Sequence, residues 1–264
     1  MKNVDVLIRK PAVAGMFYPA EKEVLEKQIN RFLEDAKCSV KEKPKAIIIP
    51  HAGYVYSGQI AAIGYKIISK YVSGIQNVII IGPSHHAEFD GCVMSSADAW
   101  ETPSGTIAVN KNYISPISDI IRFLDQPHKK EHSIEVQVPF IQAVLPRAKI
   151  VPILTGHINP EKLAKELDKY ISEKDMLVIS TDLSHYHSYD EARKIDAIAN
   201  NAIPSLDIKN VEAGVEACGK TGVLSCMHLA RIHSWKGEML GYATSGDTAG
   251  DKKSVVGYGC YGFY

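Results

Sequence analysis

AIIIPHAGY (residues 46–54) and NVIIIGPSHH (residues 77–86) each run from a short apolar segment straight into a histidine. KIVPILTGH (residues 149–157) and DMLVISTDLSHYH (residues 175–187) repeat the pattern. Apolar runs of this length, bounded by glycine and proline, are typical of strands buried on both faces in a sheet covered by helices. In open α/β sheets, ligands bind beyond the carboxyl ends of the strands. We therefore expect several imidazoles along one sheet edge, in a metal or acid/base site.

Helical segments are expected between and after these strands. Apolar side chains recur with a 3.6-residue period in residues 21–37 and 160–173, and residues 59–72 complete a β-α-β unit. Helices are also expected at residues 132–145, where Pro139 interrupts the helix, and at residues 190–205, 210–218 and 226–235. Short antiparallel strands are expected within residues 90–109. No linker or repeat divides the chain. We predict one α/β domain over residues 1–264, a three-layer α-β-α sandwich with a mixed, largely parallel central sheet.

Composition excludes several classes of function. The 264 residues carry 30 basic and 30 acidic side chains, so no net field attracts nucleic acid or an anionic membrane. No apolar stretch reaches the length of a membrane span. Charges at Asp5, Arg9 and Lys10 interrupt the N-terminal apolar stretch, which argues against a signal peptide.

The cysteines favour a reducing compartment. They are odd in number, widely spaced and without a C-x-x-C pair: Cys38, Cys92, Cys218, Cys226 and Cys260. We interpret them as small buried side chains rather than as a disulfide framework or a structural zinc site. The protein is therefore expected to be cytoplasmic.

Two of the strand-end histidines are the first candidates for function. His51 follows Pro50 in a tight, polar P-H-A-G turn, which is not a core packing position. His85 and His86 follow the next strand, and because adjacent side chains point in different directions, one of the two is expected to face the site. Structural roles stay open for each histidine alone, but the repeated position favours a shared site.

Asp182 and His185 combine a carboxylate and an imidazole three residues apart. On one turn of helix they would share a face. Such a pair can bind a metal, or the carboxylate can orient the imidazole for proton transfer. The alternative is an Asp N-cap with surface histidines. His187 is interpreted as a bystander on the solvent side.

Two further segments leave function and structure open. Glu131, His132 and Glu135 lie at an expected helix start, where carboxylates are favoured by the helix dipole in any case. The TSGDTAGD segment (residues 244–251) is either an exposed turn or a loop that supplies Asp247 or Asp251 to the site. The remaining histidines are expected to be structural or at the surface: His128, His157, His228 and His233.

Taken together, these motifs resemble the Memo family of bacteria, archaea and eukaryotes. RKPAVAGMFYPA, PHAGYVYSG, GPSHH, TPSG, EHSIEVQVPFIQ, STDLSHYH and GYATSGD occur in the family's order and extend over essentially the whole chain. The family's fold is similar to that of class III extradiol dioxygenases, which are non-haem Fe(II) enzymes that cleave catechol rings. The resemblance implies a dioxygenase-like fold with a metal site.

In those dioxygenases two histidines and a late carboxylate bind iron, and further histidines handle protons. Carried over by motif, His51 and His85 would be the two histidine ligands. His185 would line the site with Asp182 beside it, and His132 would be a second proton-handling residue. Two histidines and a carboxylate with open positions are the pattern of an Fe(II) oxygenase. Fe(II) is the expected ion, with copper or zinc as alternatives.

The third ligand is the point of departure from the family. The dioxygenases use a glutamate there, and eukaryotic Memo proteins carry a cysteine in the corresponding loop. Counting back from the SVVGYG strand places that position at about Thr248, with Asp247 beside it. Because threonine is a poor ligand, Asp247 is the expected third ligand, unless the site has two histidines only.

Three functions follow from the residues and the resemblance. The first is an oxidoreductase acting on a small cyclic or aromatic substrate. The second is a non-catalytic module that binds a peptide or small ligand in the same pocket, although the sequence shows no arginine cluster for phosphate. The third is a hydrolase with zinc on His51, His85 and Asp182. Prokaryotic relatives often accompany a radical-SAM protein, which is therefore an expected partner.

Overall fold

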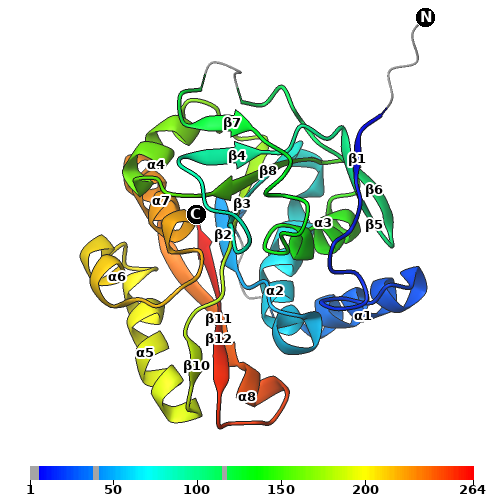
Figure 1. Cartoon of the computed structure of the whole chain (residues 1–264). Coiled ribbons are helices and arrows are strands. Elements are labelled where there is room, and N and C mark those ends of the chain that lie inside the picture. Colours follow the sequence, from blue (N-terminus) through cyan, green and yellow to red (C-terminus); the bar gives the residue numbers. More distant parts are fainter. Residues whose placement is uncertain (1–5, 38–41, 115–117) are drawn as a thin grey trace, which may run out of the picture.

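The structure, a computed structural model, describes residues 6–37, 42–114 and 118–264. Asp5 and Cys38 lie outside these residues. The strands are β1 (Ile8–Arg9), β2 (Ala46–Ile49), β3 (Asn77–Pro83), β4 (Cys92–Met94), β5 (Ala99–Thr102), β6 (Gly105–Ala108), β7 (Ile121–Phe123), β8 (Lys149–Thr155), β9 (Asp175–Ser180), β10 (His185–His187), β11 (Gly237–Thr244) and β12 (Val255–Phe263). Nine of them form one sheet in the order β10-β12-β2-β9-β3-β8-β4-β7, with β11 also paired to β12 (Figure 1). β1, β5 and β6 form a small second sheet.

The four apolar runs of the sequence are the four central strands of the large sheet. β2, β9, β3 and β8 are adjacent and parallel, with Ile47 opposite Val178 and Ile79 opposite Val151. An antiparallel strand flanks them on each side: β12 pairs antiparallel with β2, and β4 pairs antiparallel with β8. The expected mixed, largely parallel sheet is therefore confirmed.

Helices cover both faces of this sheet (Figure 1). They are α1 (Lys22–Asp35), α2 (Tyr54–Ile68), α3 (Val138–Val144), α4 (Pro160–Asp168), α5 (Tyr189–Ala202), α6 (Ile208–Gly214), α7 (Lys220–Ile232) and α8 (Ser245–Thr248), with 3₁₀ turns η1 (Ser69–Gly74) and η2 (Glu135–Gln137). Alternate residues of one strand enter different cores: Ile47 packs in the cluster with α1, α2 and α3, and Ile48 in the cluster with α4 to α7. This is a three-layer α-β-α sandwich in one domain, as predicted.

Small residues let α2 lie close to the sheet. Ala61 and Ala62 are buried, and a Cβ added at Gly64 would be 3.0 Å from Ile47 Cδ1. A larger side chain at position 64 would push the helix outward and open a gap, which costs free energy in a close-packed interior. α2 begins directly after the His51 loop, so its packing also fixes where that loop lies.

The helical segment expected over residues 132–145 is interrupted, as predicted, but the break precedes Pro139: η2 comes before α3, and Pro139 lies in the first turn of α3, where its missing N–H costs no hydrogen bond. One local prediction was wrong. Asp182 and His185 do not share a helical turn, because His185 begins strand β10, which pairs antiparallel with β12. Tyr186 has a positive φ of 64°, a conformation that does not continue a helix.

Within the described ranges, no helix combines the length and apolar character needed to cross a membrane.

Candidate metal centre

Three neighbouring parallel strands end at the same edge of the sheet. β2, β9 and β3 lie side by side, and His51, Asp182 and His85 each follow two residues after the last residue of their strand. Because the strands are parallel and in register, their following loops meet. The fold itself therefore brings two histidines and a carboxylate together.

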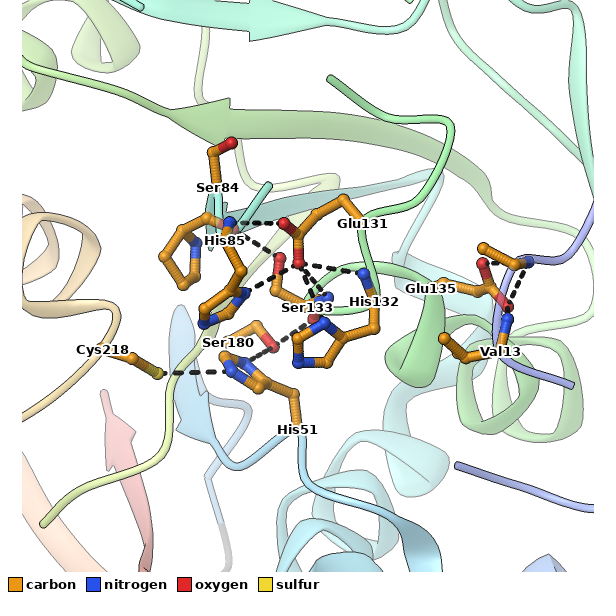
Figure 2. A network of polar contacts seen from close by, with 12 residues as sticks. Val13, His51, Ser84, His85, Glu131, His132, Ser133, Glu135, Ser180 and Cys218 are labelled. Carbon is orange, nitrogen blue, oxygen red and sulfur yellow. Dashed lines mark hydrogen bonds and ion pairs between the residues drawn. The ribbon is translucent and has the colours of Figure 1, made fainter. Parts of the chain in front are cut away.

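A third histidine arrives from the loop before η2. The ring centroids of His51 and His132 are 5.3 Å apart, those of His51 and His85 also 5.3 Å, and those of His85 and His132 4.6 Å. One ring nitrogen from each of the three lies within 4.8 Å of the others. Figure 2 shows the three rings directed toward one another. This spacing allows one ion to contact all three.

Hydrogen bonds fix which nitrogen of His51 is available. Ser180 Oγ donates its only proton to the carbonyl of Ser133 at 2.5 Å and accepts an N–H from Gln137 Nε2 at 2.8 Å. Its remaining lone pair therefore accepts from His51 Nδ1 at 2.9 Å. With the proton on Nδ1, Nε2 of His51 keeps a free lone pair for a metal ion.

Glu131 orients the rings of the other two histidines, His85 and His132. It is 1% exposed, and its carboxylate accepts the ring N–H of His85 at 2.9 Å and the backbone N–H of His85 at 2.6 Å. It also accepts the backbone N–H groups of His132 and Ser133, both at 2.9 Å, and lies 3.3 Å from His132 Nδ1. A buried carboxylate that orients metal-ligating imidazoles is typical of metal sites.

Charges in the site follow from these contacts. Burial alone would raise the pKa of Glu131, but the hydrogen bonds and charge of His85 hold it far below its usual range. Burial lowers the pKa of His85, but hydrogen bonds with Cys218 and Glu131 outweigh it and raise the pKa to about 9. Burial and the neighbouring His51 lower the pKa of His132 to about 3. Protonation of His85 therefore competes with metal binding at its ring.

A second group, His86, Glu131 and His132, also has ligand atoms within 4.8 Å of one another. Glu131, however, already receives N–H groups on both oxygens from His85, His132 and Ser133. A cation there would have to break these bonds. The three-histidine group is therefore the better candidate.

The histidines open into a cavity of about 990 Å³. Its wall carries four aromatic side chains, Phe17, Tyr56, Tyr186 and Tyr258. Asp182 and Asp251 are its acidic residues, and no lysine or arginine lines it among the described residues. Another hollow of about 850 Å³ lies at the amino ends of β3 and β8, but no histidine lines it within the described part of the chain.

Asp182 and His185 line this cavity with His51, His85 and His132. The carboxylate of Asp182 accepts the backbone N–H of His51 at 2.8 Å, so it holds the loop after β2 in place. His185 reaches the cavity from β10. The structure thus brings five of the six predicted site residues together.

Asp247 is the residue that the structure does not bring to the histidines. Its Oδ2 accepts the backbone N–H and the hydroxyl of Thr244 at 2.8 and 2.9 Å, which closes a capping box on α8. Its Oδ1 accepts the Tyr189 hydroxyl at 2.7 Å. Neither Asp247 nor Thr248 is among the described residues that line the cavity, whereas Asp251 of the same loop is. Among the described residues, His132 rather than Asp247 joins His51 and His85 in a group that could hold a metal ion.

The sequence interpretation assigned no definite functional role to two residues of the site. Glu131 was left open between a helix-dipole position and a functional one, and its carboxylate orients His85 and His132. Cys218 was attributed to the core, yet it lines the cavity, with its sulfur 3.3 Å from His51 Nε2. Cys92 and Cys226 do match the core interpretation. The position of Glu131 directly before His132 was the one available signal in the sequence.

The other histidines lie elsewhere. His157, after β8, is exposed and lines a different hollow. His187 contacts Glu216 at 2.9 Å, and His233 contacts Asp168 at 2.6 Å, both near the surface. His128 is buried against Trp100.

Comparison with known proteins supports one family for this fold and site. A family model described as "Memo-like protein" matches residues 9–261. The chain belongs to the Memo family. Relatives named "MEMO1 family protein" include those of Aquifex aeolicus (36% identical, covering 95% of this chain and 97% of the relative), Sulfolobus acidocaldarius (38%, 96% and 98%) and Nitrosopumilus maritimus (35%, 97% and 100%). The Memo resemblance of the sequence motifs is thereby confirmed over nearly the full length of this Memo protein.

Proposed function

We propose that this Memo protein is a metal-dependent oxidoreductase for a small cyclic or aromatic substrate. His51, His85 and His132 would hold a divalent transition-metal ion, with Fe(II) as the principal candidate. The proposal rests on the arrangement of the three imidazoles. One ring nitrogen of each lies within 4.8 Å of the others, and Nδ1 of each ring lies next to Ser180 or Glu131. Such oriented imidazoles are what a metal site requires.

The donor set fits a transition metal. Imidazole suits iron, copper, zinc and nickel, whereas magnesium and calcium prefer oxygen ligands. The buried carboxylate of Glu131 offsets part of the charge of a divalent ion. A bound ion would supply Lewis-acid and redox chemistry at the cavity wall.

The cavity wall supports a ring-shaped substrate. Phe17, Tyr56 and Tyr258 offer aromatic faces, which pack well against planar rings. Recognition of phosphate generally uses arginine or lysine, and the described lining has neither. This argues against a pocket for phosphorylated peptides, and in favour of a neutral or weakly acidic small molecule.

The chain's own residues would handle the proton of such a substrate. His185 lies in the cavity wall and can take or return a proton at a substrate hydroxyl. Asp182 holds the backbone of His51 and so keeps that imidazole in position. His185 is the catalytic residue of this proposal, and Asp182 is a positioning residue.

Zinc hydrolysis is a second candidate, favoured by the three-histidine donor set. Three histidines with an open position bind zinc in carbonic anhydrase and activate water there. His132 would then replace Asp182 as the third ligand.

We also propose a cytoplasmic location, since Cys92, Cys218 and Cys226 are free thiols. The association with a radical-SAM protein remains a prediction.

Oxygen consumption tests the function. Protein loaded anaerobically with Fe(II) is mixed with catechols and other small phenols, and dioxygen uptake is recorded for wild type, His185→Ala and His187→Ala. We expect uptake to fall by about 10²- to 10⁴-fold in His185→Ala, as for loss of a general acid or base. His187→Ala, two residues further on the same strand, should retain it. Turnover of esters by the zinc form alone, with no oxygen uptake, would replace the first candidate by the second.

A further inference from the structure

The Cys218 thiol lies against the histidine group. Its sulfur is 3.3 Å from His51 Nε2, the nitrogen whose lone pair is left free when Nδ1 bonds to Ser180 (Figure 2). Cys218 therefore contacts one of the three proposed ligands directly and lines the same cavity as the other two.

The loop between α6 and α7 holds this sulfur in place. The backbone N–H of Cys218 donates to the carbonyl of Asp182 at 3.3 Å, and the backbone N–H of Asp182 donates to Cys218 Sγ, also at 3.3 Å. A backbone N–H that donates to a metal-bound thiolate orients the sulfur, as hydrogen bonds to other metal ligands do. The sulfur therefore lies at the end of β9 and already accepts a hydrogen bond from the backbone N–H of Asp182.

Gly219 makes the close approach feasible. A Cβ at this position would lie 2.8 Å from the carbonyl oxygen of Ser180 and 2.8 Å from Thr181 Cβ. Its N–H donates to Thr181 Oγ1 at 2.8 Å. Any larger residue would push the loop, and Cys218 with it, away from the strand.

We propose that the Cys218 thiolate is a fourth protein ligand of the ion held by His51, His85 and His132. This inference rests on the proposed metal site. In a tetrahedral site with bonds of about 2.3 Å to sulfur and about 2.0–2.1 Å to nitrogen, the two ligand atoms are about 3.5 Å apart. The observed 3.3 Å between Cys218 Sγ and His51 Nε2 agrees with that value. The group of described ligand atoms around His51 that lie within 4.8 Å of one another holds the three histidines alone, so the sulfur must move closer to the other imidazoles as the ion binds. The thiol proton is released to solvent as the sulfur–metal bond forms.

The fourth ligand narrows the choice of ion and of chemistry. A thiolate with imidazoles favours iron, zinc or copper(I) over magnesium and manganese. Zinc with four protein ligands would be closed to substrate, as in structural sites. Iron accepts more than four ligands and keeps positions open. The thiolate thus favours the oxidoreductase over the hydrolase.

Cobalt substitution tests the fourth ligand. Wild type, Cys218→Ser, Cys218→Ala and the control Cys92→Ala are loaded with Co(II), and their absorption spectra are recorded. We expect an intense sulfur-to-cobalt charge-transfer band in the near ultraviolet for wild type and Cys92→Ala. Both Cys218 variants should lose this band but keep the weak visible bands of cobalt bound to histidine. Their cobalt affinity should fall by about 10- to 100-fold or more.

Each outcome bears on a different claim. If the charge-transfer band is absent from wild type, or persists in both Cys218 variants, while cobalt still binds, the fourth ligand is overturned and the histidine site stands. If wild type binds no cobalt at all, the proposed metal site itself fails.

Cysteine alkylation of the wild-type protein tests the same ligand without variants, which could misfold. Alkylation of Cys218 is followed by mass spectrometry with and without zinc, and Cys226 serves as the internal reference. We expect zinc to protect Cys218 and to leave Cys226 unchanged. Equal labelling of Cys218 in the two samples would contradict the proposal.

Discussion

Glu131 is the residue on which the geometry of the site depends most. Its buried carboxylate accepts the ring N–H of His85 and the backbone N–H groups of His85, His132 and Ser133. Because both oxygens are engaged, Glu131 cannot rotate without releasing at least one histidine. Glu131 is a positioning residue, and its loss would disturb the orientation of both His85 and His132.

Replacing Glu131 by glutamine tests this role. The amide keeps the size of the side chain but cannot accept hydrogen bonds on both arms, so the ring of His85 loses its orientation. We expect zinc affinity to fall by about 10- to 100-fold. Competition with a chromophoric chelator measures it. Glu88→Gln, an exposed carboxylate near the same loop, is the control and should bind zinc as wild type does.

The sequence predicted part of this site at the level of residues. His51 and His85 could be assigned because each follows a buried strand, and strand ends in α/β sheets carry ligands. Asp247 could not be excluded, because only the structure shows its carboxylate bonded to Thr244 and Tyr189. Cys218 could not be assigned, because it reaches His51 through a tertiary contact between distant segments.

Among the elements, α8 shows how a local interaction removes a candidate ligand. Its capping box uses Oδ2 of Asp247, which bonds to Thr244, and Oδ1 of the same carboxylate accepts the Tyr189 hydroxyl. Burial opposes ionisation of Asp247, but these hydrogen bonds lower its pKa below the usual value of 3.8. Asp247 therefore contributes to stability as a carboxylate.

Asp247→Asn measures this contribution. We expect a loss of about 1 kcal/mol at neutral pH, the usual net contribution of a hydrogen bond. Because the folded-state pKa is lowered, the stability that Asp247 contributes is present above pH about 4 and is lost as the pH falls below it. Urea unfolding should therefore give a larger difference between the variant and wild type at pH 7 than at pH 3. An equal difference at both pH values would contradict the assignment.

The N-terminal strand β1 supports the site from a distance. Arg9 forms a buried ion pair with Glu135 at 2.7 Å, and its other nitrogens donate to the carbonyls of His128 and Glu131, each at 2.8 Å. These bonds tie β1 to the loop that carries Glu131 and His132. Sequence patterns could not show this pairing, since its partners are more than 100 residues apart.

Arg9→Met tests this tie. Removal of one partner of a buried ion pair leaves Glu135 as an uncompensated buried charge, which costs about 3–5 kcal/mol. The exposed pair of Lys10 with Glu101 is the control, and Lys10→Met should cost about 1 kcal/mol or less. Chemical denaturation gives both values. Similar losses in the two variants would show that the Arg9 pair contributes no more than a surface ion pair.

At the scale of the whole molecule, strand order decides which loops meet. β9 enters the sheet between β2 and β3, so the loop with Asp182 lies between those of His51 and His85, whereas β8 lies beyond β3 and His157 falls outside the cavity. The apolar runs and helical periods predicted the layers of the fold correctly. They could not predict strand order or the pairing of β10 with β12, because these depend on contacts between segments far apart in the chain.

Metal content of anaerobically purified protein tests the central claim most directly, and two variants decide which residue is the third ligand. The proposed site predicts about one transition-metal ion per chain in wild type and in Asp247→Asn, and a large loss in His132→Ala, with His157→Ala as a control that retains the ion. Full metal content in His132→Ala together with its loss in Asp247→Asn would contradict the three-histidine centre.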